Sequence, residues 1–201
     1  MLGNVVQANV VRLKAVQVKT ALSILLILAL AACATQKTAS ESAPPSAIQA
    51  VPSGMPAINP NSAVYEVPVA DGVTYQDVVD SLKSVSEGMN FVNPANFPIA
   101  DHLKLRGVDP QGVKEVHSFC NLSMGTEIML DHPEFLVFAP CRIALYEKPD
   151  TNKKLKLFIG LDRPTFDLKS IKNPTERAKK SAQELESALI LLMSKARKGD
   201  L

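Results

Sequence analysis

The feature that most constrains this chain is a short apolar run near its start, from Ala21 to Leu30. The ten residues carry no charge, whereas a transmembrane helix needs about 20 residues to cross the hydrocarbon of a bilayer. The preceding segment contains Arg12, Lys14 and Lys19 and no acidic residue. A basic flank followed by a short apolar core is typical of a secretory signal peptide, which is removed from the mature protein. We therefore expect the folded part of the chain to begin after this segment.

The apolar run ends in Leu30-Ala31-Ala32-Cys33, which resembles the lipobox of bacterial lipoproteins. The resemblance implies removal of residues 1–32, a thioether-linked lipid on Cys33, and acylation of the new amino group by a fatty acid such as palmitate. Several acyl chains on one residue anchor a protein far more firmly than the single chain that binds only marginally. Ala34, rather than Asp, follows the cysteine, which favours the outer membrane of a Gram-negative envelope. The sequence thus predicts a lipid-anchored, periplasm-facing protein.

Removal of the signal segment changes the charge of the protein. The whole chain has 22 Lys and Arg against 20 Asp and Glu. Residues 1–32 take three of the basic side chains with them, which leaves 19 basic and 20 acidic residues and a formal charge of −1. Clustered Lys and Arg are the electrostatic footprint of nucleic-acid binding. The mature chain has no such excess, so nucleic acid is not an expected partner.

The segment after the cysteine has the composition of a spacer. Residues 33–63 are dominated by Ser, Ala, Pro and Thr and show no periodic apolar face. Such a segment cannot bury enough surface to offset the entropy lost on ordering. We expect residues 33–63 to be a disordered tether that spans roughly 30 Å, and residues 64–201 to form one domain.

The domain is predicted to have an α+β fold. Helices are indicated by capping residues followed by apolar stripes at helical spacing, with Gly88 as the left-handed end of the first. They are expected over 74–88, 101–106, 121–131 and 174–199. Strands are indicated by β-branched and aromatic runs between turn residues. They are expected over 64–69, 113–119, 134–147 with a kink at Pro140, and 155–161. This order predicts a single domain with helices packed on a small mixed sheet.

Two segments carry a family resemblance. One is His117-Ser118-Phe119-Cys120-Asn121, followed by a helix that ends in Asp131-His132-Pro133. The other is Ala139–Glu147, which contains Pro140-Cys141-Arg142. Together they resemble the domain of unknown function 302 family. The resemblance covers most of 64–201 and implies a compact α+β fold that commonly self-associates. It implies no established activity.

The motifs of the common cofactor and hydrolase sites are absent, including GxGxxG, GxxxxGK[ST], HExxH, CxxC and GxSxG. The residues left for chemistry are Cys120 and Cys141. In an oxidising compartment they are expected to form a structural pair, buried or bridged by a disulfide. Alternatively they are a redox pair, because Cys120 precedes the helix cap Asn121 and a helix N-terminus lowers the pKa of a thiol.

A metal site is the third reading of the same region. His117, Cys120, Met124 and Cys141 are spaced so that a strand end and the first turn of a helix bring them together. Thiolate, thioether and imidazole ligands suit copper as Cu(I). The sequence thus leaves two functions open. The first is a non-catalytic binding or accessory module for an unknown periplasmic partner or small ligand, without a cofactor. The alternative is a thiol-redox or copper-handling protein.

Overall fold

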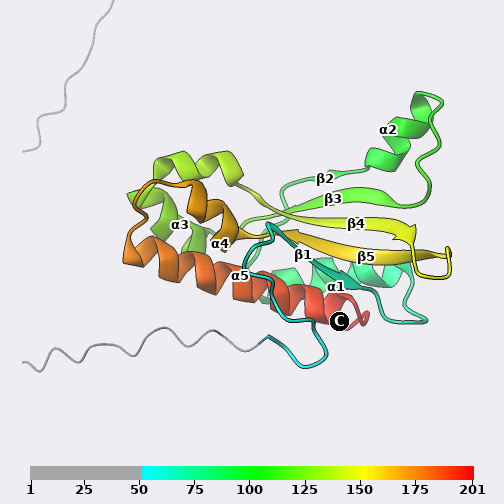
Figure 1. The fold of residues 1–201 in the computed structure, drawn as a ribbon, viewed down its shortest axis with the longest axis horizontal. Coiled ribbons are helices and arrows are strands. Elements are labelled where there is room, and N and C mark those ends of the chain that lie inside the picture. The colour runs from blue at the N-terminus through cyan, green and yellow to red at the C-terminus, as the bar shows by residue number, and fades with distance from the viewer. Residues whose placement is uncertain (1–50) are drawn as a thin grey trace, which may run out of the picture. The chain divides into compact units, whose positions relative to one another are not determined.

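The computed structural model describes residues 51–201, and within them the chain forms one antiparallel sheet with helices on it (Figure 1). The strand order is β1-β5-β4-β3-β2. All four pairings are antiparallel, so the α+β class is confirmed and the sheet is antiparallel rather than mixed. The strands are β1 (Val64–Pro68), β2 (Asn96–Phe97), β3 (Lys114–Phe119), β4 (Cys141–Pro149) and β5 (Leu155–Asp162).

The three longest helices begin where short polar side chains cap them. Thr74 and Asp77 form a capping box at the first helix, and the Asn121 and Thr175 side chains accept hydrogen bonds from Met124 N and Ala178 N. Each cap satisfies an otherwise unpaired backbone N–H. The α-helices are α1 (Tyr75–Gly88), α2 (Ile99–Leu105), α3 (Leu122–Asp131), α4 (Pro164–Asp167) and α5 (Glu176–Ala196). Two short 3₁₀ helices are η1 (Pro133–Phe138) and η2 (Leu168–Ser170).

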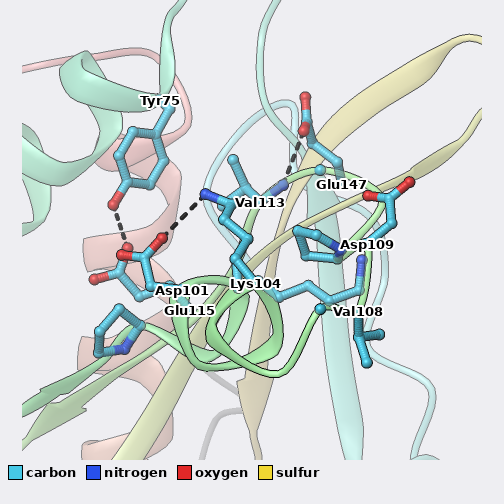
Figure 2. Close-up of a pocket in the computed structure, with 14 residues that line it drawn as sticks. Tyr75, Asp101, Lys104, Val108, Asp109, Val113, Glu115 and Glu147 are labelled. Atoms are coloured by element: carbon cyan, nitrogen blue, oxygen red, sulfur yellow. Dashed lines mark hydrogen bonds and ion pairs between the residues drawn. The ribbon is translucent and has the colours of Figure 1, made fainter.

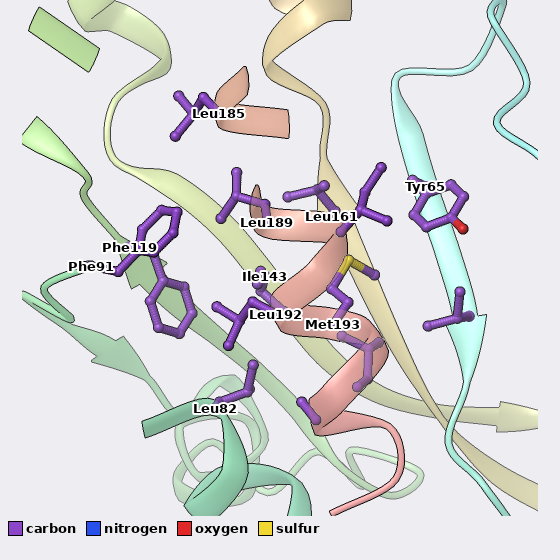
Figure 3. Packing of buried hydrophobic residues seen from close by; sticks show 14 of the residues in the cluster. Tyr65, Leu82, Phe91, Phe119, Ile143, Leu161, Leu185, Leu189, Leu192 and Met193 are labelled. Carbon is purple, nitrogen blue, oxygen red and sulfur yellow. The ribbon is translucent and has the colours of Figure 1, made fainter. Parts of the chain in front are cut away.

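The core lies between one face of the sheet and the helices (Figure 3). Alternate residues of the central strands point toward α5, among them Ile143, Leu145 and Leu161, which are completely or almost completely buried. Leu189 and Leu192 of α5 meet them. This alternation is expected of an antiparallel sheet with one covered face. α2 is different, because none of its residues is buried, and it projects from the end of the sheet beside β3 (Figure 1).

Part of the segment expected to be a tether is docked on the domain. The guanidinium of Arg163 donates to the carbonyls of Asn59 and Ser62 at 2.7 Å each, and the Tyr65 hydroxyl donates to Pro56 O at 2.8 Å. Val51, Met55 and Ile58 pack against the core. The expectation of a spacer reaching residue 63 is therefore wrong for 51–63, because composition does not show that distant polar groups satisfy this backbone. The tether residues before 51, the signal segment and Cys33 lie outside the described residues.

Two local predictions are corrected. The strand expected over 134–147 begins only at Cys141, because Pro133 occupies the first turn of a 3₁₀ helix that runs to Phe138. Gly88 is not the left-handed residue after α1: Met89 is the C-cap, and Asn90 has a φ of 59°. Asn is the non-glycine residue that tolerates this conformation best. Among residues 51–201, no helix is long and apolar enough to cross a membrane.

Candidate functional site

An open groove of about 970 Å³ lies between α2, the start of β3 and the first turn of α1 (Figure 2). This volume lies within the range of small-molecule sites. The groove has apolar walls from Pro98, Val108, Pro110 and Val113, interrupted by charged side chains. We call it the acidic groove, because it is lined by Asp101, Asp109, Glu115 and Glu147 but only by Lys104 and Lys114 among basic residues.

Glu115 is the best-positioned carboxylate of the acidic groove. It lies on β3 on the helix-facing side, and its side chain is only 14% exposed. The hydroxyl of Tyr75, in the first turn of α1, donates to Glu115 Oε2 (Figure 2). Burial, the hydrogen bond to Glu115 and the negative charge of Glu115 together raise the pKa of Tyr75 to about 12. Tyr75 thus stays protonated and acts as a donor that fixes this carboxylate.

His117 lies behind Glu115 and has an unsatisfied nitrogen. Its side chain is 3% exposed, and its Nε2 lies 3.5 Å from Glu115 Oε1, too far for a hydrogen bond. Burial lowers the pKa of His117, and the nearby Glu115 charge opposes this only in part. The imidazole is therefore neutral near pH 7. A buried polar atom without a partner is rare in folded proteins and calls for an explanation.

Two further contacts fix charged side chains of the acidic groove, one with the backbone and one between side chains. Glu147 Oε2 accepts from Val113 N at 2.9 Å, and Lys104 forms an ion pair with Asp101 at 3.0 Å (Figure 2). Gly112 has a φ of 96°, and a Cβ there would lie 2.4 Å from the Glu147 carboxylate. Only glycine lets the chain pass this carboxylate in that conformation.

The predicted cysteine pair lies in a different hollow, at the other end of β3 and β4. Cys120 and Cys141 both line an apolar cavity of about 50 Å³, together with Met129, Phe135 and Asp167. They are neighbours because Cys141 pairs in register with Phe119, the residue before Cys120. The two cysteines are free thiols, so the disulfide expectation is not confirmed. We call this hollow the thiol cavity.

The thiols are less acidic than the sequence suggested. Asn121 does cap α3 as predicted, but burial raises the pKa of Cys120. Burial also raises the pKa of Cys141 to about 12, with smaller contributions from Cys120, Asp162 and Asp167. Desolvation disfavours the thiolate. The burial of Cys120 therefore works against the activation expected from its position before the cap.

The four expected metal ligands do not come together at the thiol cavity. Neither His117 nor Met124 lines it, and the His117 ring stacks on Phe119 with centroids 6.5 Å apart. Among residues 51–201, no three His, Cys, Asp or Glu side chains are arranged to hold a metal ion. His117 instead belongs with Glu115, because alternate residues of a strand share a face.

Asp167, the last residue of α4, is a further ionisable group at the thiol cavity. Burial, with a smaller contribution from the charge of Asp162, raises the pKa of Asp167 to about 6. A carboxyl with a raised folded-state pKa is stabilising only while it is protonated. The stability it contributes is therefore lost as pH rises from about 4 through 6.

We expect Asp167→Asn to become progressively more stable than the unchanged protein between pH 4 and pH 7.5. The gain is about 1 kcal/mol, after discounting the shift for the partial exposure of the carboxyl. Urea unfolding at both pH values measures it, with Asp71→Asn at an exposed carboxylate as the control. A difference between Asp167→Asn and the unchanged protein that does not vary with pH would contradict this assignment.

Sequence reasoning missed the acidic groove. Tyr75 and Glu115 are 40 positions apart, and each reads as an ordinary exposed position of a helix or strand. The available signal was Gly107 to Gly112, a stretch with two glycines and Pro110 that predicts a turn between β3 and the preceding segment. It did not indicate which side chains the turn would bring together.

Comparisons with known proteins agree with this fold. The family model described as "Domain of unknown function DUF302" matches residues 65–192. An uncharacterized protein of Aquifex aeolicus is 35% identical over 80 residues, which cover 40% of this chain and 49% of that protein. The chain thus matches about half the length of this relative. The crystal structure of an uncharacterized conserved DUF302 protein from Bacillus stearothermophilus superposes with a TM-score of 0.58. It shares 18% identity, and the match covers 67% of this chain and 98% of that one.

Proposed function

The chain belongs to the family described as domain of unknown function DUF302, and we propose that its domain is a ligand-binding module held at a membrane surface by the lipid on Cys33. The observation that carries the binding role is the acidic groove. It combines a volume of about 970 Å³, apolar walls and a shielded carboxylate fixed by Tyr75. Fixed polar groups beside apolar walls are what orient a small ligand.

The proposal does not require catalysis. Several polar groups of the acidic groove already have hydrogen-bond or ion-pair partners within the protein. Tyr75 donates to Glu115, Lys104 pairs with Asp101, and Glu147 accepts from the backbone. Tyr75 is the one hydroxyl among them, and it stays protonated as the donor to Glu115. Preorganised donors and acceptors instead lower the entropy cost of binding. We therefore infer that the protein is a lipid-anchored accessory protein on the periplasmic face of the outer membrane. Its function is to bind a ligand in the acidic groove.

We expect small molecules to bind in the acidic groove and a groove-filling substitution to exclude them. Ala100→Trp introduces an indole on α2, a helix with no buried residue, so the core is not disturbed. In a fragment screen read by backbone amide shifts, hits should move the amides of Glu115 and Val113, and Ala100→Trp should weaken them at least tenfold. The full chain carrying Cys33→Ser provides the protein without its expected lipid site.

Leu155→Trp is the matched control, because Leu155 is exposed on β5 outside the groove. It should leave every hit unchanged. Fragments that leave the groove amides unmoved, or that bind equally well to Ala100→Trp, would contradict the proposal.

Thiol chemistry is the second candidate, favoured by the shared cavity of Cys120 and Cys141. In a redox role the two thiols would exchange with an external disulfide, becoming one bridge while the external disulfide leaves as two thiols. In a copper-handling role they would bind Cu(I) as thiolates, with Met129 close by in the cavity wall. Replacing both cysteines by Ser separates the candidates, because groove binding should persist and either thiol function should be lost.

A further inference from the structure

We propose that the acidic groove binds a linear aliphatic polyamine, a flexible chain of methylene groups that carries two or more ammonium groups. This inference rests on the proposed binding function and names its ligand class. Its first support is the balance of charge, because four carboxylates and only two ammonium groups line the groove. A ligand that brings positive charge is favoured at such a surface.

The negative charge of the groove is not neutralised within the protein. Lys104 pairs with Asp101, but the ammonium of Lys114 donates to the carbonyl of Gln111 at 3.1 Å. Among residues 51–201, Asp109, Glu115 and Glu147 form no ion pair with a Lys or Arg. Glu115 is the important case, because a charged group that is mostly shielded from water is costly unless it is paired.

His117, which does not itself line the groove, shows that the hydrogen bonding around Glu115 is incomplete. Its buried Nε2 has no hydrogen-bond partner and faces Glu115 Oε1 across 3.5 Å. His117 is neutral near pH 7, because burial lowers its pKa, so it does not supply the missing cation. The carboxylate therefore has one oxygen fixed by Tyr75 and one without a close donor. An ammonium group, with three N–H donors and no acceptor, matches the free oxygen.

The apolar lining decides between a polyamine and a bare metal cation. Pro98, Val108, Pro110 and Val113 line the groove together with the carboxylates, and their side chains offer apolar contacts but no oxygen ligands. Mg²⁺ and Ca²⁺ require six or more oxygens, including water, at close range. An aliphatic chain with spaced ammonium groups complements both parts of the lining. Its methylene groups can contact the apolar residues, and its ammonium groups can pair with the carboxylates.

Titration calorimetry of the full chain carrying Cys33→Ser, with spermidine as the probe, tests this inference. We expect saturable binding that weakens at least tenfold between 20 mM and 200 mM NaCl, because ionic contacts are screened. Glu115→Gln and Glu147→Gln should each weaken binding about fivefold to tenfold. Glu134→Gln, at an exposed acid outside the groove, should leave it unchanged.

Three further probes make the outcome decisive. 1,4-Butanediol should not bind, and Mg²⁺ at equal charge should compete at least tenfold less well than spermidine. Tri-lysine that binds more than tenfold tighter than spermidine would overturn the inference in favour of a basic peptide. Groove hits that are neutral fragments, with no spermidine binding, would overturn the ligand class and leave the binding function standing. If neither the fragments nor spermidine bind, both the binding function and the ligand class are wrong.

Discussion

Replacing Glu186 by Gln is expected to lower the free energy of unfolding by about 3–5 kcal/mol. Glu186 and Arg163 form an ion pair at 2.9 Å, with side chains that are 6% and 7% exposed. The other carboxylate oxygen accepts from Thr165 N at 3.0 Å and from the Thr165 hydroxyl. Removing the carboxylate charge leaves the guanidinium buried and uncompensated, and this penalty exceeds the loss of any single hydrogen bond.

The effect of Glu186→Gln should extend beyond the ion pair between Arg163 and Glu186. Arg163 also holds the carbonyls of Asn59 and Ser62, so the docked segment 51–63 depends on the same guanidinium. Urea unfolding gives the change in stability, and amide hydrogen exchange at Ser62 reports whether the segment loosens. Glu184→Gln is the control on the same helix, because Glu184 makes only an exposed contact with Lys180 at 3.9 Å. Its cost should stay below about 0.5 kcal/mol. Equal losses in the two variants would show that the buried pair is not a main source of stability.

Changing Cys33 to Ala is expected to abolish lipidation, and either to release the protein from membranes or to leave it unprocessed, the largest cellular effect that we predict. Each buried methylene of a lipid chain contributes about 0.8 kcal/mol, so several chains hold the mature protein essentially irreversibly. Without the thiol no thioether lipid forms, and the variant should be found in the soluble fraction or remain unprocessed. Expression in a Gram-negative bacterium with labelled palmitate measures both the label and the fractionation.

Cys120→Ala is the matched control, since it removes a thiol from the domain and leaves the expected lipid site intact. It should keep its label and its membrane fraction, while Cys33→Ala loses the label and is either released or left unprocessed. Retention of label in Cys33→Ala would refute the anchor. Fractionation of the unchanged protein with the inner membrane would refute only the outer-membrane assignment based on Ala34.

The parts of the fold that depend on neighbouring residues could be predicted from sequence. Thr74 and Asp77 are three positions apart and form the cap of α1, and Asn121 caps α3 as expected. The hairpin of β4 and β5 follows from its turn residues at 149–152. The start of β4 could not be placed, because an apolar stretch such as 134–138 suits a strand and a buried turn of helix alike.

The candidate sites depend on contacts between distant residues, and sequence reasoning therefore recovered them only in part. The family resemblance singled out Cys120 and Cys141, and the structure does bring them to one cavity. It separates His117 from that cavity, because strand register places His117 beside Glu115. The contact between Arg163 and Asn59 spans 104 positions. No local pattern indicates such a contact, so the composition of the docked segment predicts a spacer instead.

A crystal structure of the protein grown with spermidine, or with the tightest fragment, tests the central claim most directly. We predict density for the ligand in the acidic groove, with a polar atom of the ligand within hydrogen-bonding distance of Glu115 and its apolar atoms against Val108 and Val113. Tyr75 should still donate to the same carboxylate. Ligand density at the thiol cavity beside Cys120 and Cys141, with an empty groove in the same crystal, would contradict the account.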